Sequence, residues 1–165
     1  MDIVHVVHPF APLFSPESRV LILGSFPSVK SREQGFFYGH RQNRFWPMLA
    51  AVYGERAPDW ADIPAKRDLV LRHHLALWDS IYACDITGSS DASVRNAVPI
   101  DIARITGAAR IERILCNGAL SGRLYRQYLE PVTGIPALVL PSTSPANAAF
   151  SMDRLVEAWG AALQL

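Results

Sequence analysis

The sequence predicts an α/β fold in three layers, with a central four-stranded parallel sheet between two layers of helices. Two observations favour this class. Short apolar runs of about four to eight residues, the length of buried strands, alternate with longer segments whose apolar residues recur at helical spacing. Each run also ends in a turn that contains glycine, asparagine, aspartate or proline. Strands that alternate with helices form parallel sheets joined by right-handed crossovers.

The elements follow from these patterns in chain order. Strands are expected at residues 19–23, 77–84, 111–116 and 137–140. Helices are expected at 43–54, 66–75, 101–109 and 119–129, and a last amphipathic helix carries apolar positions from Phe150 to Leu163. Residues 1–18 are proline-rich and aperiodic, which predicts an arm packed over the core with His5 and His8 as surface histidines. Residues 87–99 are expected to form a long polar loop.

Size and composition limit the class of protein. The chain has 165 residues, half of them hydrophobic, so a single domain spanning residues 1–165 is expected. Cys84 and Cys116 lie far apart with no metal-ligand spacing, so we expect buried free thiols, no metal and no cofactor. No apolar run approaches the roughly 20 residues of a membrane span, and no signal sequence precedes the first strand. A soluble, cytoplasmic monomer is therefore expected.

Polar loops follow all four predicted strands: 24–28 (GSFPS), the loop after the second strand, 117–119 (NGA) and 141–147 (PSTSPAN). In parallel α/β sheets, ligands bind outside the carboxyl ends of the strands. The segment between the first of these loops and the next helix concentrates rings and amides, including Tyr38, His40 and Asn43. Phe36, Phe37, Phe45 and Trp46 are expected in the core, which leaves Tyr38 as the exposed ring. This composition predicts a pocket for a flat ligand with a polar edge.

Two common chemistries are disfavoured by spacing. GSFPSVKS lacks the second glycine of a phosphate-binding loop, and no GxGxxG follows the first strand. A hydrolase with a Ser-His-acid triad needs its serine in a GxSxG elbow, whereas Pro27 stands where a helix would begin. Nucleoside triphosphates, dinucleotides and serine hydrolase chemistry are not indicated.

The motifs resemble those of the uracil-DNA glycosylase superfamily. Gly24–Ser28 and the following YGHRQNRFW at 38–46 resemble the first motif of the mismatch-specific glycosylases, and PSTSPAN at 141–147 resembles the superfamily's last loop. Phe26 occupies the position of the usual catalytic Asn or Asp. GSFPS, HRQNRFW, CNGA and STSPAN together are similar to the hypoxanthine-DNA glycosylase branch, also called deoxyinosine glycosylases.

The resemblance implies roles for individual residues. It assigns catalysis to Asn43 and a second essential role to Asn117. It implies a base-binding group made of Gly24, Ser25, Phe26, Pro27, Tyr38 and His40, in which Tyr38 stacks on the base and His40 fixes the loop. It implies DNA contacts from Ser28, Ser142, Thr143, Ser144, Pro145, Ala146 and Asn147. In the loop Ser142–Asn147, serine hydroxyls and backbone N–H groups are expected to bind phosphates, and Pro145 and Ala146 to fill the space that the base leaves.

An asparagine suits this chemistry on physical grounds. Cleavage of an N-glycosidic bond places negative charge on the departing base and positive charge on the sugar, so a site needs donors aimed at the base and a positioned water. The carbonyl oxygen of an asparagine can orient the water, and its amide can donate to a base carbonyl. The target base must first leave the helix and stack in a pocket.

Structural alternatives stay open for these residues. Asn43 could cap the next helix, Asn117 could belong to an ordinary Asn-Gly turn, and Asp79 could bind a base edge or cap its strand. Lys30 is expected to be a solvated lysine, so no lyase step is predicted.

The sequence therefore predicts a monofunctional, metal-free DNA glycosylase of base excision repair that acts on DNA containing deaminated bases, hypoxanthine first. Uracil or G·U and G·T mismatches are the alternative substrates. A module that binds damaged DNA without catalysis is the alternative from another class, which the near-neutral net charge of +1 and Phe26 leave open.

Overall fold

The computed structural model describes residues 2–164. Its centre is an all-parallel sheet in the order β3-β2-β6-β7. The strands are β2 (Val20–Gly24), β3 (Leu75–Asp79), β6 (Arg113–Asn117) and β7 (Ala137–Leu140). Every residue of β2 and β3 is buried, as expected for parallel strands covered on both faces. The predicted fold class and its four-stranded parallel sheet are confirmed.

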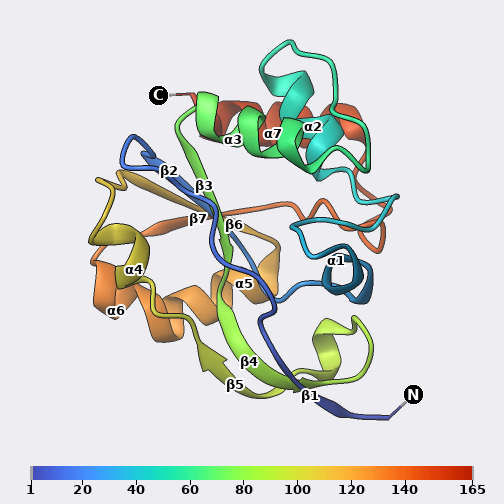
Figure 1. Cartoon of the computed structure of the whole chain (residues 1–165), viewed down its shortest axis with the longest axis vertical. Coiled ribbons are helices and arrows are strands. Elements are labelled where there is room, and N and C mark those ends of the chain that lie inside the picture. The colour runs from blue at the N-terminus through green and yellow to red at the C-terminus, as the bar shows by residue number, and fades with distance from the viewer. Residues whose placement is uncertain (1, 165) are drawn as a thin grey trace.

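Helices cover both faces of this sheet (Figure 1). On one side lie α2 (Phe45–Val52), α3 (Ile63–Arg72) and α7 (Met152–Leu163). On the other lie α4 (Ala103–Thr106), α5 (Ala119–Leu124), a π-helical turn at Tyr125–Leu129 and α6 (Glu130–Thr133). The four aromatic residues predicted for the core, Phe36, Phe37, Phe45 and Trp46, are all buried.

A second sheet, absent from the sequence prediction, packs beside the first. It is antiparallel, in the order β1-β4-β5, and contains β1 (Val4–Val7), β4 (Ile81–Ile86) and β5 (Arg95–Pro99). The single strand expected at 77–84 is therefore wrong, because the chain leaves one sheet at Asp79 and enters the other at Ile81. Only Ser80 separates the two apolar runs, and its N–H donates to the carbonyl of Gly24 at 2.8 Å.

The same sheet changes two further expectations. The arm at 1–18 contributes β1, which carries His8 into the interior, where it is 8 % exposed instead of lying on the surface. The polar loop at 87–99 contains a 3₁₀ turn at Asp91–Ser93 and all of β5. Both strands are mostly exposed along their whole length, so their sequences carry no buried apolar face that a pattern could reveal.

A short helix, α1 (Val29–Gln34), interrupts the segment expected to be a loop after β2. Ser28 is its N-cap, since the Ser28 hydroxyl accepts from the Ser31 N–H, and Gly35 ends it in the left-handed conformation that glycine tolerates. Helix α3 also begins earlier than expected, because Asp62 caps it and Pro64 fits its first turn. Cys84 and Cys116 are buried and free. Across residues 2–164, no helix combines the length and apolarity that crossing a bilayer requires.

Candidate active site

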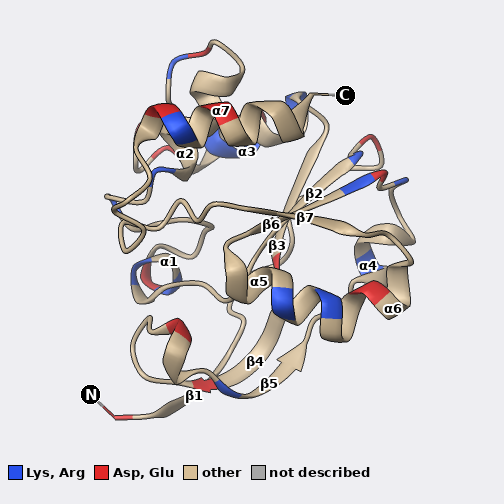
Figure 2. Ribbon diagram, turned by 180° about the vertical axis from the view of Figure 1, so that it is seen from behind, with Lys and Arg blue, Asp and Glu red and all other residues tan. Residues whose placement is uncertain are grey.

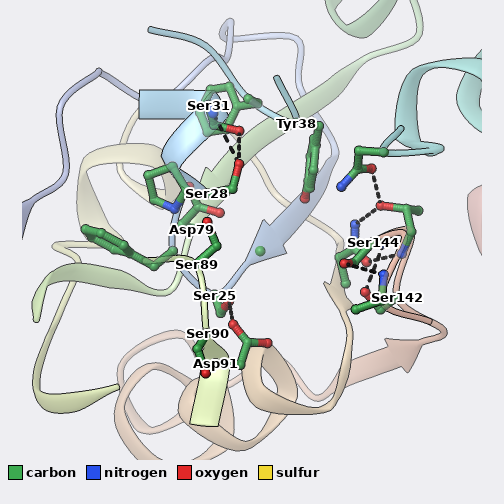
Figure 3. A pocket seen from close by; sticks show the side chains of 18 residues that line it. Ser25, Ser28, Ser31, Tyr38, Asp79, Ser89, Ser90, Asp91, Ser142 and Ser144 are labelled. Carbon is green, nitrogen blue, oxygen red and sulfur yellow. Dashed lines mark hydrogen bonds between the residues drawn. The ribbon is translucent and has the colours of Figure 1, made fainter. Parts of the chain in front are cut away.

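A pocket of about 390 Å³ opens at the carboxyl ends of the parallel strands (Figure 3). It falls within the range of about 300 to 1,000 Å³ that is typical of small-molecule sites. Its walls come from the loop after β2, the segment between α1 and α2, the ends of β3 and β6, the loop after β4 and the loop after β7. The lining residues are Gly24, Ser25, Phe26, Pro27, Ser28, Ser31, Phe37, Tyr38, Asn43, Asp79, Ser89, Ser90, Asp91, Asn117, Ser142, Thr143, Ser144 and Ala146.

Asn43 and Asn117 are joined through Thr143. The Asn117 side chain binds Thr143 twice: Oδ1 accepts from the Thr143 N–H and Nδ2 donates to Oγ1, both at 3.0 Å. The Thr143 hydroxyl in turn donates to Asn43 Oδ1 at 2.8 Å. Thr143 is completely buried, so water does not compete for these bonds. The network holds three loops, and both asparagines, in one arrangement.

The network determines which end of each amide can act on a ligand. Asn43 Oδ1 also accepts from the Phe45 N–H at 3.0 Å, so both of its lone pairs are used. No residue in the described part of the chain accepts from Asn43 Nδ2, and Asn117 Nδ2 keeps one of its two protons. The two side chains therefore offer N–H donors at the pocket, where the sequence had suggested a carbonyl oxygen for positioning water.

Tyr38 lies against the same pocket in a strained backbone conformation. Its φ is 53°, a left-handed value that non-glycine residues seldom adopt and that is often found at functional sites. One face of the ring stacks on Phe45, with centroids 4.0 Å apart and planes inclined by 21°. The hydroxyl is buried and makes no hydrogen bond of ordinary geometry with the described residues, and the Asn117 amide lies beside it. Burial, and secondarily the nearby Asp79 carboxylate, raises the pKa of Tyr38, which keeps the phenol protonated.

The loop after β2 forms a further wall and is tied to its neighbours. Arg32 of α1 donates to the carbonyls of Pro27 and Gly88, at 2.9 and 3.3 Å. The Ser25 hydroxyl donates to Asp91 at 3.3 Å, and burial raises the pKa of that carboxyl. The loop after β4 is thus joined to the loop after β2 around the pocket.

Comparison with known proteins identifies the family of the chain. The family model of the uracil DNA glycosylase superfamily matches residues 11–163. The chain belongs to the uracil DNA glycosylase superfamily. A hypoxanthine DNA glycosylase of Methanosarcina acetivorans is 32 % identical over 147 residues, covering 88 % of this chain and 90 % of that protein. One from Methanosarcina barkeri is 28 % identical over 139 residues, covering 84 % and 86 %.

A solved structure agrees with these relatives. The solution NMR structure of a Methanosarcina acetivorans protein, described as a candidate uracil DNA glycosylase, superposes with a TM-score of 0.77 at 29 % identity. It covers 93 % of this chain and 94 % of its own. The expectation of a DNA glycosylase in this superfamily, similar to the hypoxanthine branch, is confirmed.

Most of the residues assigned to the glycosylase site from sequence do gather at the pocket. Both asparagines, Gly24–Ser28, Tyr38, Ser142, Thr143, Ser144 and Ala146 line it. Pro145 and Ala146 are exposed at the tip of their loop, where they are accessible to DNA. Asn147 closes the loop, because Nδ2 donates to the carbonyl of Ser142 at 3.0 Å.

Two assignments from sequence do not fit the glycosylase structure. Thr143 cannot contact DNA as expected, because it is fully buried and its N–H and hydroxyl are bonded to the asparagines. His40 does not line this pocket. It lines a neighbouring cavity with Trp60 and Lys66, which Tyr38 and Asn43 also border. His40 does fix its loop, since Nδ1 accepts from the Gln42 N–H at 3.1 Å.

Sequence reasoning missed several residues of the glycosylase site. Arg44 of the NRFW motif donates to the carbonyls of Ser144, Asn147 and Phe150, which holds the loop after β7 against the start of α2. The NRFW motif contains this arginine, but its targets lie about 100 residues away along the chain. Asp79, already a candidate from the sequence, lines the pocket, but no local pattern predicted its contact with His8.

Proposed function

We propose that this glycosylase is monofunctional and releases hypoxanthine from DNA. The observation that carries the proposal is the joined pair Asn43–Asn117, which presents amide donors at a pocket walled by Tyr38 and Phe26. The names of the two Methanosarcina relatives support hypoxanthine as the base.

The mechanism begins with a flipped nucleotide. The base enters the pocket against Tyr38, whose far face rests on Phe45. The exposed tip at Pro145 and Ala146 occupies the space that the base leaves in the duplex. The hydroxyls of Ser142 and Ser144 each accept from a backbone N–H two residues later, and each keeps its own proton to donate to a phosphate.

Bond cleavage then depends on the two amides. As the bond between C1′ and N9 lengthens, its electron pair moves to the base, and negative charge builds on the purine ring and its carbonyl oxygen. Nδ2 of Asn43 and the free proton of Asn117 Nδ2 donate to that charge. Water adds to C1′ and loses a proton, and the released base gains one. Phe26 stands where other branches carry a water-activating Asn or Asp, so donor stabilisation of the leaving group must carry more of the catalysis here.

None of the described residues that line the pocket is a lysine, which supports hydrolysis without a Schiff base. Lys30, the lysine nearest the first motif in sequence, lies on α1 with its side chain 61 % exposed and pairs with Glu33 at 3.4 Å.

The test is excision from duplex DNA with a single deoxyinosine, followed by alkaline cleavage of abasic sites. Asn43→Ala is expected to slow base release by about a hundredfold or more, the usual effect of removing a donor to developing charge. Gln42→Ala is the matched control, since this exposed neighbouring amide does not line the pocket. Equal rates for wild type and Asn43→Ala would contradict the mechanism.

Uracil is the second candidate substrate, favoured by the superfamily model and the solved structure. A panel of duplexes with hypoxanthine, uracil, G·U and G·T distinguishes the two. We expect hypoxanthine to be released fastest, and faster release of uracil or thymine would reverse the assignment.

A further inference from the structure

His8 and Asp79 form a buried pair at the base pocket. His8 Nε2 lies 2.7 Å from Asp79 Oδ2, and the two side chains are 1 % and 6 % exposed. The His8 N–H donates to the carbonyl of Tyr82 at 2.7 Å, which extends the pairing of β1 with β4 and holds the residue in place. The imidazole packs against Phe10, with ring centroids 4.7 Å apart, and near Phe26 at 5.9 Å.

The surroundings determine which atoms of the pair are used. The Phe10 N–H donates to His8 Nδ1 at 3.5 Å, so the ring proton is on Nε2 and is donated to Asp79 Oδ2. Asp79 lines the pocket, and no described residue donates to its Oδ1. Oδ1 lies over Gly24, where any side chain would collide with it, and near the Tyr38 hydroxyl. Figure 3 shows Asp79 on the side of the pocket across from Ser142 and Ser144.

An unpaired carboxylate oxygen in such a place distinguishes a deaminated base from its parent base. Adenine has a lone pair at N1 beside its amino group, and deamination to hypoxanthine replaces these with N1–H beside a carbonyl. Cytosine and uracil differ in the same way at N3. A carboxylate oxygen accepts from the new ring N–H, whereas it repels a ring lone pair.

We propose that Asp79 recognises the ring N–H created by deamination and that His8 is the positioning residue that aims it. This inference rests on the proposed function, because it assigns a specificity determinant to the same pocket. His8 satisfies Oδ2 and thereby leaves Oδ1 as the acceptor directed at the base. Guanine also carries N1–H, so the pair separates hypoxanthine from adenine and not from guanine.

Single-turnover excision of three bases tests the role of Asp79: hypoxanthine, adenine, and 1-methylhypoxanthine, which lacks the ring N–H. Wild type is expected to release hypoxanthine far faster than the other two. Asp79→Asn is expected to lose about ten- to a hundredfold on hypoxanthine, the usual effect of removing a charged hydrogen bond, and much less on 1-methylhypoxanthine. Glu157→Gln, an exposed carboxylate of α7, is the matched control and should change no ratio.

Variants of His8 test the positioning role. His8→Phe keeps a ring among the aromatic side chains but removes the donor to Oδ2, so the preference for hypoxanthine over 1-methylhypoxanthine should fall. His8→Gln supplies an amide N–H and should recover part of that preference. A lowered melting temperature with an unchanged preference would show a purely structural pair.

The outcomes separate the two proposals. If wild type releases hypoxanthine and Asp79→Asn leaves the ratio of the two hypoxanthines unchanged, the assignment of Asp79 is overturned and the proposed function stands. If wild type releases no deaminated base, the proposed function itself fails.

Discussion

At the scale of single residues, Thr143 has the most consequential position in the site. Its N–H and hydroxyl connect Asn117 to Asn43, and none of its surface reaches solvent. A hydroxyl that both accepts and donates is required, because Asn117 Nδ2 is a donor and Asn43 Oδ1 is an acceptor. Serine and threonine both have such a hydroxyl. Valine has nearly the shape of threonine but no hydroxyl.

Substitution of Thr143 tests the connection. Thr143→Val should slow excision of hypoxanthine by about ten- to a hundredfold, because Asn117 Nδ2 loses its buried acceptor and Asn43 Oδ1 loses a donor. Thr143→Ser should retain most of the activity. Single-turnover rates, with circular dichroism to confirm folding, give the comparison. Equal loss in both variants would mean that the methyl group, not the hydroxyl, is needed.

At the scale of elements, α3 contains a buried lysine close to the site. Lys66 is 1 % exposed, donates to the carbonyl of Trp60 at 2.7 Å and lies 5.4 Å from the centroid of Trp46. Burial lowers the pKa of Lys66 to about 8, an effect that Asp62 partly opposes. The ammonium form is therefore a cost to folding at neutral pH.

This shift predicts how stability changes with pH. Between pH 8 and its ordinary pKa of 10.5, Lys66 is neutral when folded and still protonated when unfolded, so its contribution to the free energy of unfolding rises with pH. The rise is at most about 1.4 kcal/mol per pH unit. Urea denaturation of wild type and Lys66→Met from pH 7 to 9.5 should show their difference shifting in favour of wild type. If the difference in the free energy of unfolding stays constant with pH, the lowered pKa of Lys66 is contradicted.

The denaturation measurements stop at pH 9.5 because, at higher pH, ionisation of tyrosine lowers the free energy of unfolding. Burial raises the pKa of Tyr53 to about 12, so above pH 10 this phenol ionises in the unfolded chain first and lowers stability.

At the scale of the whole molecule, positive and negative side chains nearly balance. The formal net charge is +1, and Figure 2 shows Lys and Arg interspersed with Asp and Glu over helices and loops. DNA binding must then depend on few phosphate contacts, together with capture of the flipped base in the pocket.

The salt dependence of binding follows from this distribution. The logarithm of affinity for inosine-containing duplex against the logarithm of salt concentration should have a slope shallower than about −4, equivalent to roughly four phosphate contacts. Fluorescence anisotropy with the inactive Asn43→Ala variant, from 50 to 200 mM salt, measures it. A slope near −8 would instead require a basic DNA-binding face.

Local sequence determined the parallel sheet, the aromatic core and the loops that carry the site. The reason is physical: strand and helix periodicity, together with turn residues, are properties of short segments. Since parallel strands bring their carboxyl ends to one edge, the loops after β2, β6 and β7 had to meet. Strand β7 was predicted with the bounds that it has.

Tertiary structure alone decided the contacts that give the site its chemistry. His8 meets Asp79 across 71 positions, and Thr143 meets Asn43 across 100. That Asn43 is bonded through its oxygen and keeps its NH₂ group unbonded, and that Thr143 is buried, depend on such pairs, and no local period encodes them. The second sheet was missed for the same reason, because the change of sheet at Ser80 occurs between two apolar runs that look continuous in sequence.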